Sequence, residues 1–204
     1  MATSNKIIKI NEIKKARSVF EANEPRDLFY RAATELVRLA VDNKTSLSVA
    51  DALAVLLQTW NRSYYRFRKL DVGHFKKLDL LYRKHRRRLT SYRNRAIERL
   101  RDDERPIVCD LFQEFEGVLG PVGAAKALHL LAPTFFPLWD RAIARAYDNA
   151  LGKAGTNGPR YWQFMVIARR QSLELKGNNF DCGNILKRID EYNYCKFTKR
   201  WKLN

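Results

Sequence analysis

The chain has 204 residues, 46% of them hydrophobic and 30% charged, which fits one globular domain, or two small lobes sharing an interface, and excludes a disordered protein. Lys and Arg outnumber Asp and Glu by 39 to 22, and the net charge of +17 favours nucleic acid as a partner over a solvated basic surface or membrane-surface binding. Without a long apolar run or an apolar N-terminal signal, the chain is expected to span no membrane and to be cytoplasmic.

Helical periodicity begins early in the chain. Residues 1–24 are basic and patchily apolar, which fits either one amphipathic turn or an arm. From Pro25, apolar residues recur at three- and four-residue spacing, which predicts a helix that ends near Asp42. A second helix, apolar almost all round, is predicted over residues 50–57, with Ser46 or Ser48 as its cap. It runs into a polar and aromatic segment, residues 58–66.

Two basic helices are predicted next. The first begins at Asp71 and runs into the basic stretch 83–88, and the second covers Tyr92 to Leu100. Such basic runs are usually solvated helix faces. Their interleaving with Tyr82 and Tyr92 also suits contact with a nucleic-acid backbone, without specificity.

The second half continues the helical pattern. We predict a helix over 108–115, a glycine hairpin at 119–123, a short apolar helix, and a loop at 133–140. Asp140 then opens another helix, and the C-terminal helices lie within 159–204, the last capped by Asp181 or Asn184. No alternating strand pattern occurs, so the predicted fold class is all-α, with a basic segment 1–24 and a domain 25–204.

Cysteine usage limits the chemistry of the chain. Cys109, Cys182 and Cys195 show no CxxC spacing, which argues against a disulfide framework and against a four-thiolate iron–sulfur cluster. Cys109 lies in an apolar helical pattern and is predicted to be a core residue.

The hairpin and the acid behind it suggest a chemistry. The hairpin consists of Leu119, Gly120, Pro121, Val122 and Gly123, and it would expose backbone amides at the start of the next helix, where a phosphate can bind. Seventeen residues after Gly123, Asp140 stands at another helix start. A phosphate site beside a placed acid in a basic chain indicates nucleic acid.

This stretch resembles the helix-hairpin-helix DNA glycosylase superfamily, the fold of endonuclease III. The matches are Leu119, Val122 and Gly123 in the hairpin, then Asp140, Ile143 and Arg145, with Leu151-Gly152 closing the helix. The resemblance covers roughly residues 48–152 and is strong only in the second half. It departs from the family in the Gly-Pro order and in a shorter distance from the hairpin to the acid. The resemblance implies a two-lobed helical domain. Many members of the family carry an iron–sulfur cluster, which the three scattered cysteines of this chain are not expected to bind.

The resemblance makes Asp140 the candidate catalytic residue. In a glycosylase, a carboxylate beside C1′ stabilises the positive charge on the sugar and orients the attacking water. The alternative is an ordinary helix cap, and both roles can hold. The family lysine nucleophile falls on Ala125, and Lys126, one residue later, is expected to point elsewhere on the helix, as a phosphate contact or structural residue. We therefore expect a monofunctional enzyme.

The remaining site residues follow from these segments. DNA contacts are predicted from Gly120, Pro121, Val122, Gly123, Arg62, Arg66, Lys126, Arg141 and Arg145. The base pocket is predicted to include Gln58, Trp60, Asn61, Tyr64, Tyr65, His129 and Trp139, although core packing is the better interpretation of any single aromatic residue. No metal site is expected beyond a monovalent cation at the hairpin, as in the family, and we expect a DNA-associated monomer.

The function implied is excision of a damaged or modified base, in base excision repair or in defence against modified phage DNA. Alkylated, oxidised, deaminated and virus-type bases all remain open. The alternatives are a non-catalytic helix-hairpin-helix module that binds DNA or RNA, and a bifunctional glycosylase and lyase that uses Lys126. The discriminating feature is whether Asp140 faces a cavity lined by polar and aromatic side chains or only caps a packed helix.

Overall fold

The computed structural model describes residues 8–61, 65–66, 71–178, 180 and 183–203. Every regular element in this part of the chain is helical, so the all-α prediction is confirmed. The α-helices are α1 (Ile10–Asn23), α2 (Asp27–Val41), α3 (Val49–Trp60), α5 (Val72–Arg93), α6 (Arg105–Leu131), α7 (Arg141–Ala146), α8 (Gly158–Gly177) and α9 (Ile185–Asn193). Two short 3₁₀ turns, η1 (Ile97–Arg99) and η2 (Asp102–Glu104), and a π-helical segment, η3 (Tyr194–Lys199), complete the set.

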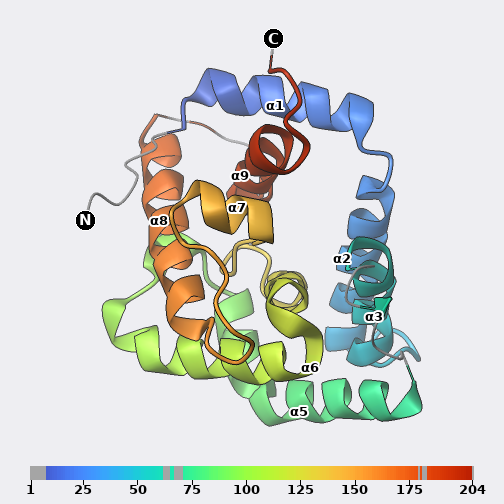
Figure 1. Cartoon of the computed structure of the whole chain (residues 1–204). Helices are drawn as coiled ribbons and strands as arrows, with labels where there is room; N and C mark the ends of the chain where they lie inside the picture. Colours follow the sequence, from blue (N-terminus) through green and yellow to red (C-terminus); the bar gives the residue numbers. More distant parts are fainter. Residues whose placement is uncertain (1–7, 62–64, 67–70, 179, 181–182, 204) are drawn as a thin grey trace.

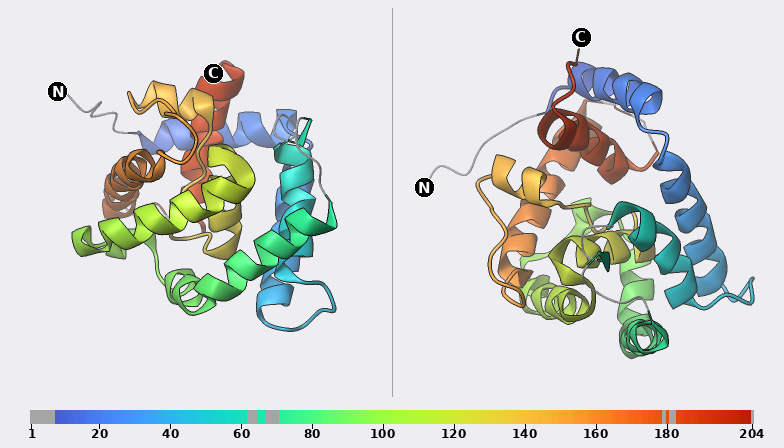
Figure 2. Two further views of the ribbon diagram at one scale, coloured as in Figure 1. Left: turned by 60° about the horizontal axis from the view of Figure 1, so that its bottom comes forward. Right: turned by 45° about the vertical axis from the view of Figure 1, so that its right-hand side comes forward.

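The outer helices surround a central group. In Figure 1, α1 crosses the top, α2 and α3 form the right side, α5 and the first part of α6 form the base, and α8 forms the left side. The second part of α6, α7 and α9 lie in the middle. Helices α2 and α3 pack against each other, and so do α6 with α8 and α1 with α9 (Figure 2). The division into two lobes stays a prediction.

Local sequence signals account for several helix ends. Ser48 caps α3, because its side chain accepts a hydrogen bond from the Asp51 amide and Asp51 in turn accepts one from the Ser48 amide. Asp71 caps α5 by accepting a hydrogen bond from the His74 amide, and Asn184 caps α9 by accepting one from the Lys187 amide. Residues 10–23, whose form the sequence left open, make a full helix that buries one apolar face against α9.

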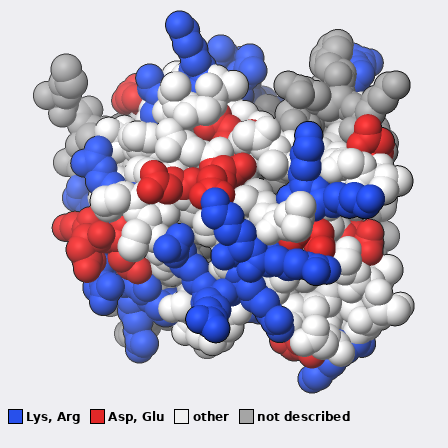
Figure 3. Space-filling model, turned by 90° about the horizontal axis from the view of Figure 1, so that it is seen from below, with Lys and Arg blue, Asp and Glu red and all other residues white. Residues whose placement is uncertain are grey.

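The basic middle of the chain differs from the prediction. Instead of two helices, one helix of 22 residues, α5, continues to Arg93, and the stretch predicted as a second helix ends in the turn η1. The run 83–88 is exposed except for His85, as expected of a solvated face. Figure 3 views this side of the molecule, where Lys and Arg side chains gather across the middle.

The predicted hairpin is a sharp break within α6. Gly120 has φ 69° and ψ 168°, a conformation that favours glycine, and Pro121 follows without an amide hydrogen to donate. Residues 105–119 and 121–131 are therefore two helical segments that meet at Gly120, and α6 turns from the base of the molecule into its centre (Figure 1). Whether this break acts as a DNA-binding hairpin stays a prediction.

Helix α7 is shorter than expected. It ends at Ala146, after six residues, whereas the resemblance predicted a helix closed by Leu151-Gly152. Asp148, with φ 54°, follows the last turn, and the chain then runs without a helix to α8. Buried Asn157 stabilises this connection, since its side chain accepts from the Gly152 amide and donates to Glu116.

Candidate active site

A cavity of about 630 Å³ lies where the central helices meet α1, α2 and α3. Its wall combines residues far apart in sequence, contributed by the ends of α1 and α3, the second part of α6, the start of α7, α9 and η3. The lining residues are Phe20, Glu24, Arg26, Trp60, Asn61, Val122, Lys126, Leu138, Trp139, Asp140, Arg141, Ala142, Ile143, Asp190, Tyr194 and Thr198. The predicted acid and part of the predicted pocket therefore share one cavity.

Asp140 both caps a helix and faces this cavity. Its Oδ1 accepts a hydrogen bond of 2.8 Å from the Ile143 amide, which makes it the N-cap of α7. Its Oδ2 accepts a hydrogen bond of 2.8 Å from the Thr198 hydroxyl, which comes from η3. Donors at both oxygens fix the orientation of the carboxylate. The two interpretations of Asp140 are thus compatible.

The loop that leads to Asp140 is held from several sides. The Tyr161 hydroxyl donates to the Pro137 carbonyl at 2.8 Å. The Ile97 amide donates to the Thr134 carbonyl at 2.9 Å, which ties the loop to η1. Both Tyr161 and Pro137 are buried. The position of Asp140 is therefore set by a packed and hydrogen-bonded segment, as preorganised catalysis requires.

His129, a predicted pocket residue, belongs to the core instead. Its side chain is fully buried and does not line the cavity. Nδ1 donates to the Phe136 carbonyl at 2.7 Å, so Nε2 accepts from the Tyr30 hydroxyl at 2.9 Å. Burial lowers the pKa of His129 to about 4, which keeps the imidazole neutral. His129 thereby supports the loop before Asp140 and is not in reach of a ligand.

Lys126 lies in the cavity, contrary to the expectation that its register would turn it away. Ala125, at the family position of the lysine, is fully buried in the core. The Lys126 ammonium donates a hydrogen bond to the Trp60 carbonyl at the end of α3. Burial lowers its pKa to about 8, and the nearby Asp140 carboxylate opposes this effect. An amine of this kind is neutral in an appreciable fraction of molecules at neutral pH.

Trp60 and Asn61 line the cavity at the end of α3, where they contact α2 and α6. The Trp60 ring stacks on Tyr30 at 5.7 Å between centroids, and its Nε1 donates to the Arg26 carbonyl at 3.1 Å. Asn61 is buried and donates to the Leu119 carbonyl at 3.4 Å, just before the break in the helix. A Cβ atom on Gly123 would lie 2.8 Å from the Asn61 amide nitrogen. Gly123 is therefore required for contact with Asn61, and its predicted role in DNA approach is untested.

The other predicted pocket residues are not brought together. Gln58 is exposed and does not line the cavity, and Tyr65 pairs with His74 through a hydroxyl-to-Nε2 distance of 3.1 Å. Trp139 is at the cavity wall, but it is only 1% exposed and packs against core aromatic residues. Arg62 and Tyr64 lie outside the described residues. Trp60, Asn61 and Trp139 are thus the predicted pocket residues that line the cavity.

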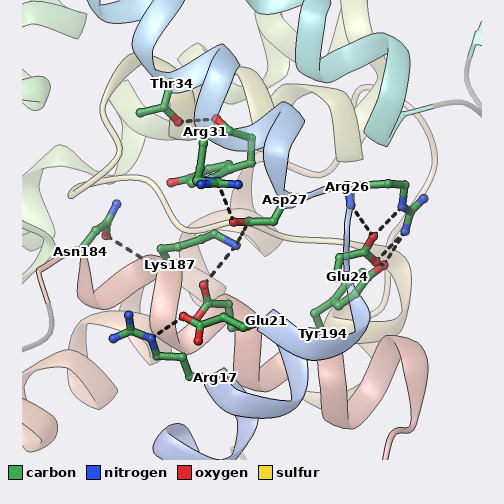
Figure 4. Close-up of polar contacts among 12 residues, drawn as sticks. Arg17, Glu21, Glu24, Arg26, Asp27, Arg31, Thr34, Asn184, Lys187 and Tyr194 are labelled. Atoms are coloured by element: carbon green, nitrogen blue, oxygen red, sulfur yellow. Dashed lines mark hydrogen bonds and ion pairs between the residues drawn. The ribbon is translucent and has the colours of Figure 1, made fainter.

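Several cavity residues were not predicted from the sequence. Glu24, Arg26 and Tyr194 form a hydrogen-bonded group at the wall (Figure 4). Arg26 donates to both oxygens of Glu24, at 2.7 and 2.8 Å, and to the Tyr194 hydroxyl at 2.8 Å. The pKa of Glu24 is lowered to about 2, above all by the hydrogen bonds from Arg26. This group is a fixed ion pair of the wall.

Asp190 is the other unpredicted acid. It lies on α9, is 7% exposed, and lines the cavity with Asp140 and Lys126. Burial raises the pKa of its carboxyl group to about 7. Its spacing from Leu186, four residues earlier on the buried face of α9, was the signal available in the sequence.

Exposed cations lie near the cavity. Arg141 lines it and is exposed, Arg145 is exposed one turn later on α7, and Arg66 is exposed after α3. In the described part of the chain, no three His, Cys, Asp or Glu side chains are grouped so that they could hold a metal ion. Cys109 is buried, as predicted, and burial raises its pKa.

Comparison with known proteins adds no further assignment. No protein-family model matches the chain, and neither a curated protein nor a solved structure matches it. Among the described residues, no helix is long and apolar enough to cross a membrane. The functional argument therefore rests on the cavity.

Proposed function

We propose that the protein is a DNA glycosylase that excises a damaged or modified base by hydrolysing the bond between the base and C1′ of its sugar. The observation that carries the proposal is that Asp140 faces a cavity lined by polar and aromatic side chains while it caps α7. The cavity volume of about 630 Å³ lies in the usual range for small-ligand pockets. A base swung out of the duplex is a ligand of this size.

Asp140 has the chemistry that the reaction needs. Breaking the glycosidic bond leaves positive charge on the sugar, and a fixed carboxylate stabilises that charge and orients a water molecule for attack. The hydrogen bonds from Ile143 and Thr198 hold the carboxylate in place before substrate binds. The net charge of +17 and the exposed Arg141 and Arg145 favour binding of the phosphate backbone. A role in base repair or in defence against modified phage DNA would use the same chemistry.

A panel of duplexes tests this proposal. Each would carry one deaminated, oxidised, alkylated or virus-type base, and abasic sites would be scored by strand cleavage in alkali. Asp140→Asn is the matched control, because Asn caps a helix about as well as Asp while the charge is lost. Release should fall by roughly 10²–10⁴-fold in this variant. If Asp140→Asn releases bases at the wild-type rate, Asp140 acts only as a helix cap. If the wild type binds DNA in a salt-sensitive way but releases no base, a non-catalytic DNA-binding module is favoured.

A second candidate function is a bifunctional glycosylase and lyase. It is favoured by one observation, the position of Lys126 in the same cavity as Asp140, with a pKa lowered to about 8. A neutral amine near C1′ can form an imine with the sugar, which leads to cleavage of the strand. Borohydride added during turnover would then trap a covalent protein–DNA adduct, and Lys126→Ala would abolish it. Base release without an adduct would support the monofunctional reaction.

A further inference from the structure

The Asp190 carboxyl group has no hydrogen-bond or ion-pair partner among the residues that the structure describes. The residue as a whole is 7% exposed and counts as buried. Lys187, three residues earlier on α9, is already within 3.0 Å of Asp27 and 3.4 Å of Glu191. A buried carboxyl group without a hydrogen bond is costly, so it is rarely retained for stability. Its free side is the cavity, where a ligand can supply the missing partner.

The surroundings of Asp190 differ from those of Asp140. Asp140 accepts a hydrogen bond at each of its two oxygens, so the protein holds it in one orientation. Asp190 receives none, and burial together with the negative charges of Asp140 and Glu191 favours its protonated form, against the effect of Lys187 and Lys126. Two acids in one cavity, one held by hydrogen bonds and one without them, are suited to different roles in one reaction.

We propose that Asp190 is a second catalytic residue, a general acid that protonates the departing base, and that the substrates are therefore neutral bases. This inference rests on the proposed glycosylase function. When the glycosidic bond breaks, its electron pair moves to the base, and the Asp190 proton passes to a ring nitrogen or carbonyl oxygen of that base. Water adds to C1′ and gives its proton to Asp140 and then to solvent, from which Asp190 is reprotonated. A base that is already cationic, such as N7-methylguanine, leaves as a neutral molecule and needs no proton.

The pH dependence of base release is set by Asp190 together with the charged and titratable groups around it. These groups are Lys126 from α6, Asp140 and Arg141 at the start of α7, Glu24 and Arg26 between α1 and α2, Tyr194 from η3, and Lys187 and Glu191 from α9 itself. With the pKa of Asp190 raised to about 7, release of a neutral base should fall tenfold per pH unit above that value. Release of a cationic base should lack this decline.

Single-turnover rates of base release test the inference. Duplexes with uracil, hypoxanthine, 8-oxoguanine or N7-methylguanine would be compared for the wild type, Asp190→Asn and Asp190→Glu. We expect release of at least one neutral base, reduced roughly 10²–10⁴-fold in Asp190→Asn and partly restored in Asp190→Glu. Any release of N7-methylguanine should change less than about threefold, as expected when no general acid is needed.

The outcomes separate this inference from the proposed function. If the wild type releases no base at all, the glycosylase function fails, and the role of Asp190 fails with it. If Asp140→Asn abolishes release but Asp190→Asn leaves the rate on neutral bases unchanged, only the role of Asp190 is overturned. Release restricted to cationic bases would overturn it as well. Should Asp190→Asn not fold, the wild-type profile decides: a neutral-base rate that does not decline above pH 7 contradicts the inference.

Discussion

Replacing Lys126 with Met should make the protein more stable at neutral pH. The ammonium group is enclosed by the cavity wall, and burial lowers its pKa from 10.5 to about 8. That difference corresponds to a penalty of about 3.4 kcal/mol for the charged amine in the folded state. Because Lys126 lines the cavity, the ammonium group is partly solvated and the penalty is smaller than this value. The Met variant also lacks the hydrogen bond that Lys126 donates to the Trp60 carbonyl, which is worth about 1 kcal/mol. We expect a net gain in unfolding free energy of about 1–2 kcal/mol at pH 7.

The pH dependence of this gain is the sharper test. Between pH 8 and 10.5 the unfolded chain binds more protons at Lys126 than the folded chain, so the wild type gains stability as the pH rises through this window. The Met variant has no such group. Its advantage should therefore shrink by about 1–2.5 kcal/mol between pH 7 and pH 10.

Urea unfolding followed by circular dichroism at pH 7, 8, 9 and 10 would measure this difference. Lys76→Met is a suitable control, because it makes the same substitution at an exposed position on α5 that does not line the cavity. A Lys126→Met protein that is less stable at pH 7, with no change in the difference up to pH 10, would refute the reasoning. The amine would then be well solvated in the cavity and poorly suited to act as a nucleophile.

Three further predictions concern the wall and surface of the site. Gly123→Val should destabilise the protein by about 1–3 kcal/mol, because the new side chain has no room beside Asn61. Gly117→Ala, on open helix surface, should stabilise the protein by up to about 1 kcal/mol. Thermal unfolding of the two variants and the wild type would measure both effects. Glu24→Gln should remove an acid-sensitive contribution of about 1–2 kcal/mol that the wild type holds above pH 4.5 and loses as the pH falls towards 2, measured by urea unfolding at pH 3 to 5. Replacing Arg141 and Arg145 together with Gln should weaken binding to all DNA sequences alike and reduce the salt slope of affinity by about 2, whereas an unchanged slope would place the phosphate contacts elsewhere.

Rules that act within a few residues predicted the fold well. Ser48 and Asn184 were each one of two predicted candidates for a cap, and both are caps in the structure. Asp71 and Asp140 were predicted at helix starts, and each caps its helix. The boundary at Arg93 was missed, because helical periodicity in the sequence continued into η1. There, the chain turns to pair with Thr134, a contact that no local pattern contains.

The candidate site depended on tertiary packing that the sequence does not encode locally. Lys126 was predicted to point away from the site, because its direction was inferred from the position of the lysine in the glycosylase family. In the structure it lines the cavity, and the break at Gly120 sets the rotation of the helical segment that carries it. His129 and Asp190 are both polar residues on buried faces. His129 makes hydrogen bonds to Tyr30 and Phe136, whereas the Asp190 side chain faces the cavity. This difference depends on how α9 and the loop before α7 pack, which no local sequence pattern shows.

The cavity wall joins the two ends of the described chain. Phe20 and Glu24 contribute to it from the α1 side, and Thr198 both lines it and donates to Asp140. Contacts of such large sequence separation form late, because the intervening chain must first be ordered. While residue 198 is still inside the ribosome, the nascent chain lacks one wall of the cavity and the hydrogen bond from Thr198 to Asp140. Partly made chains therefore carry basic surface but an incomplete cavity.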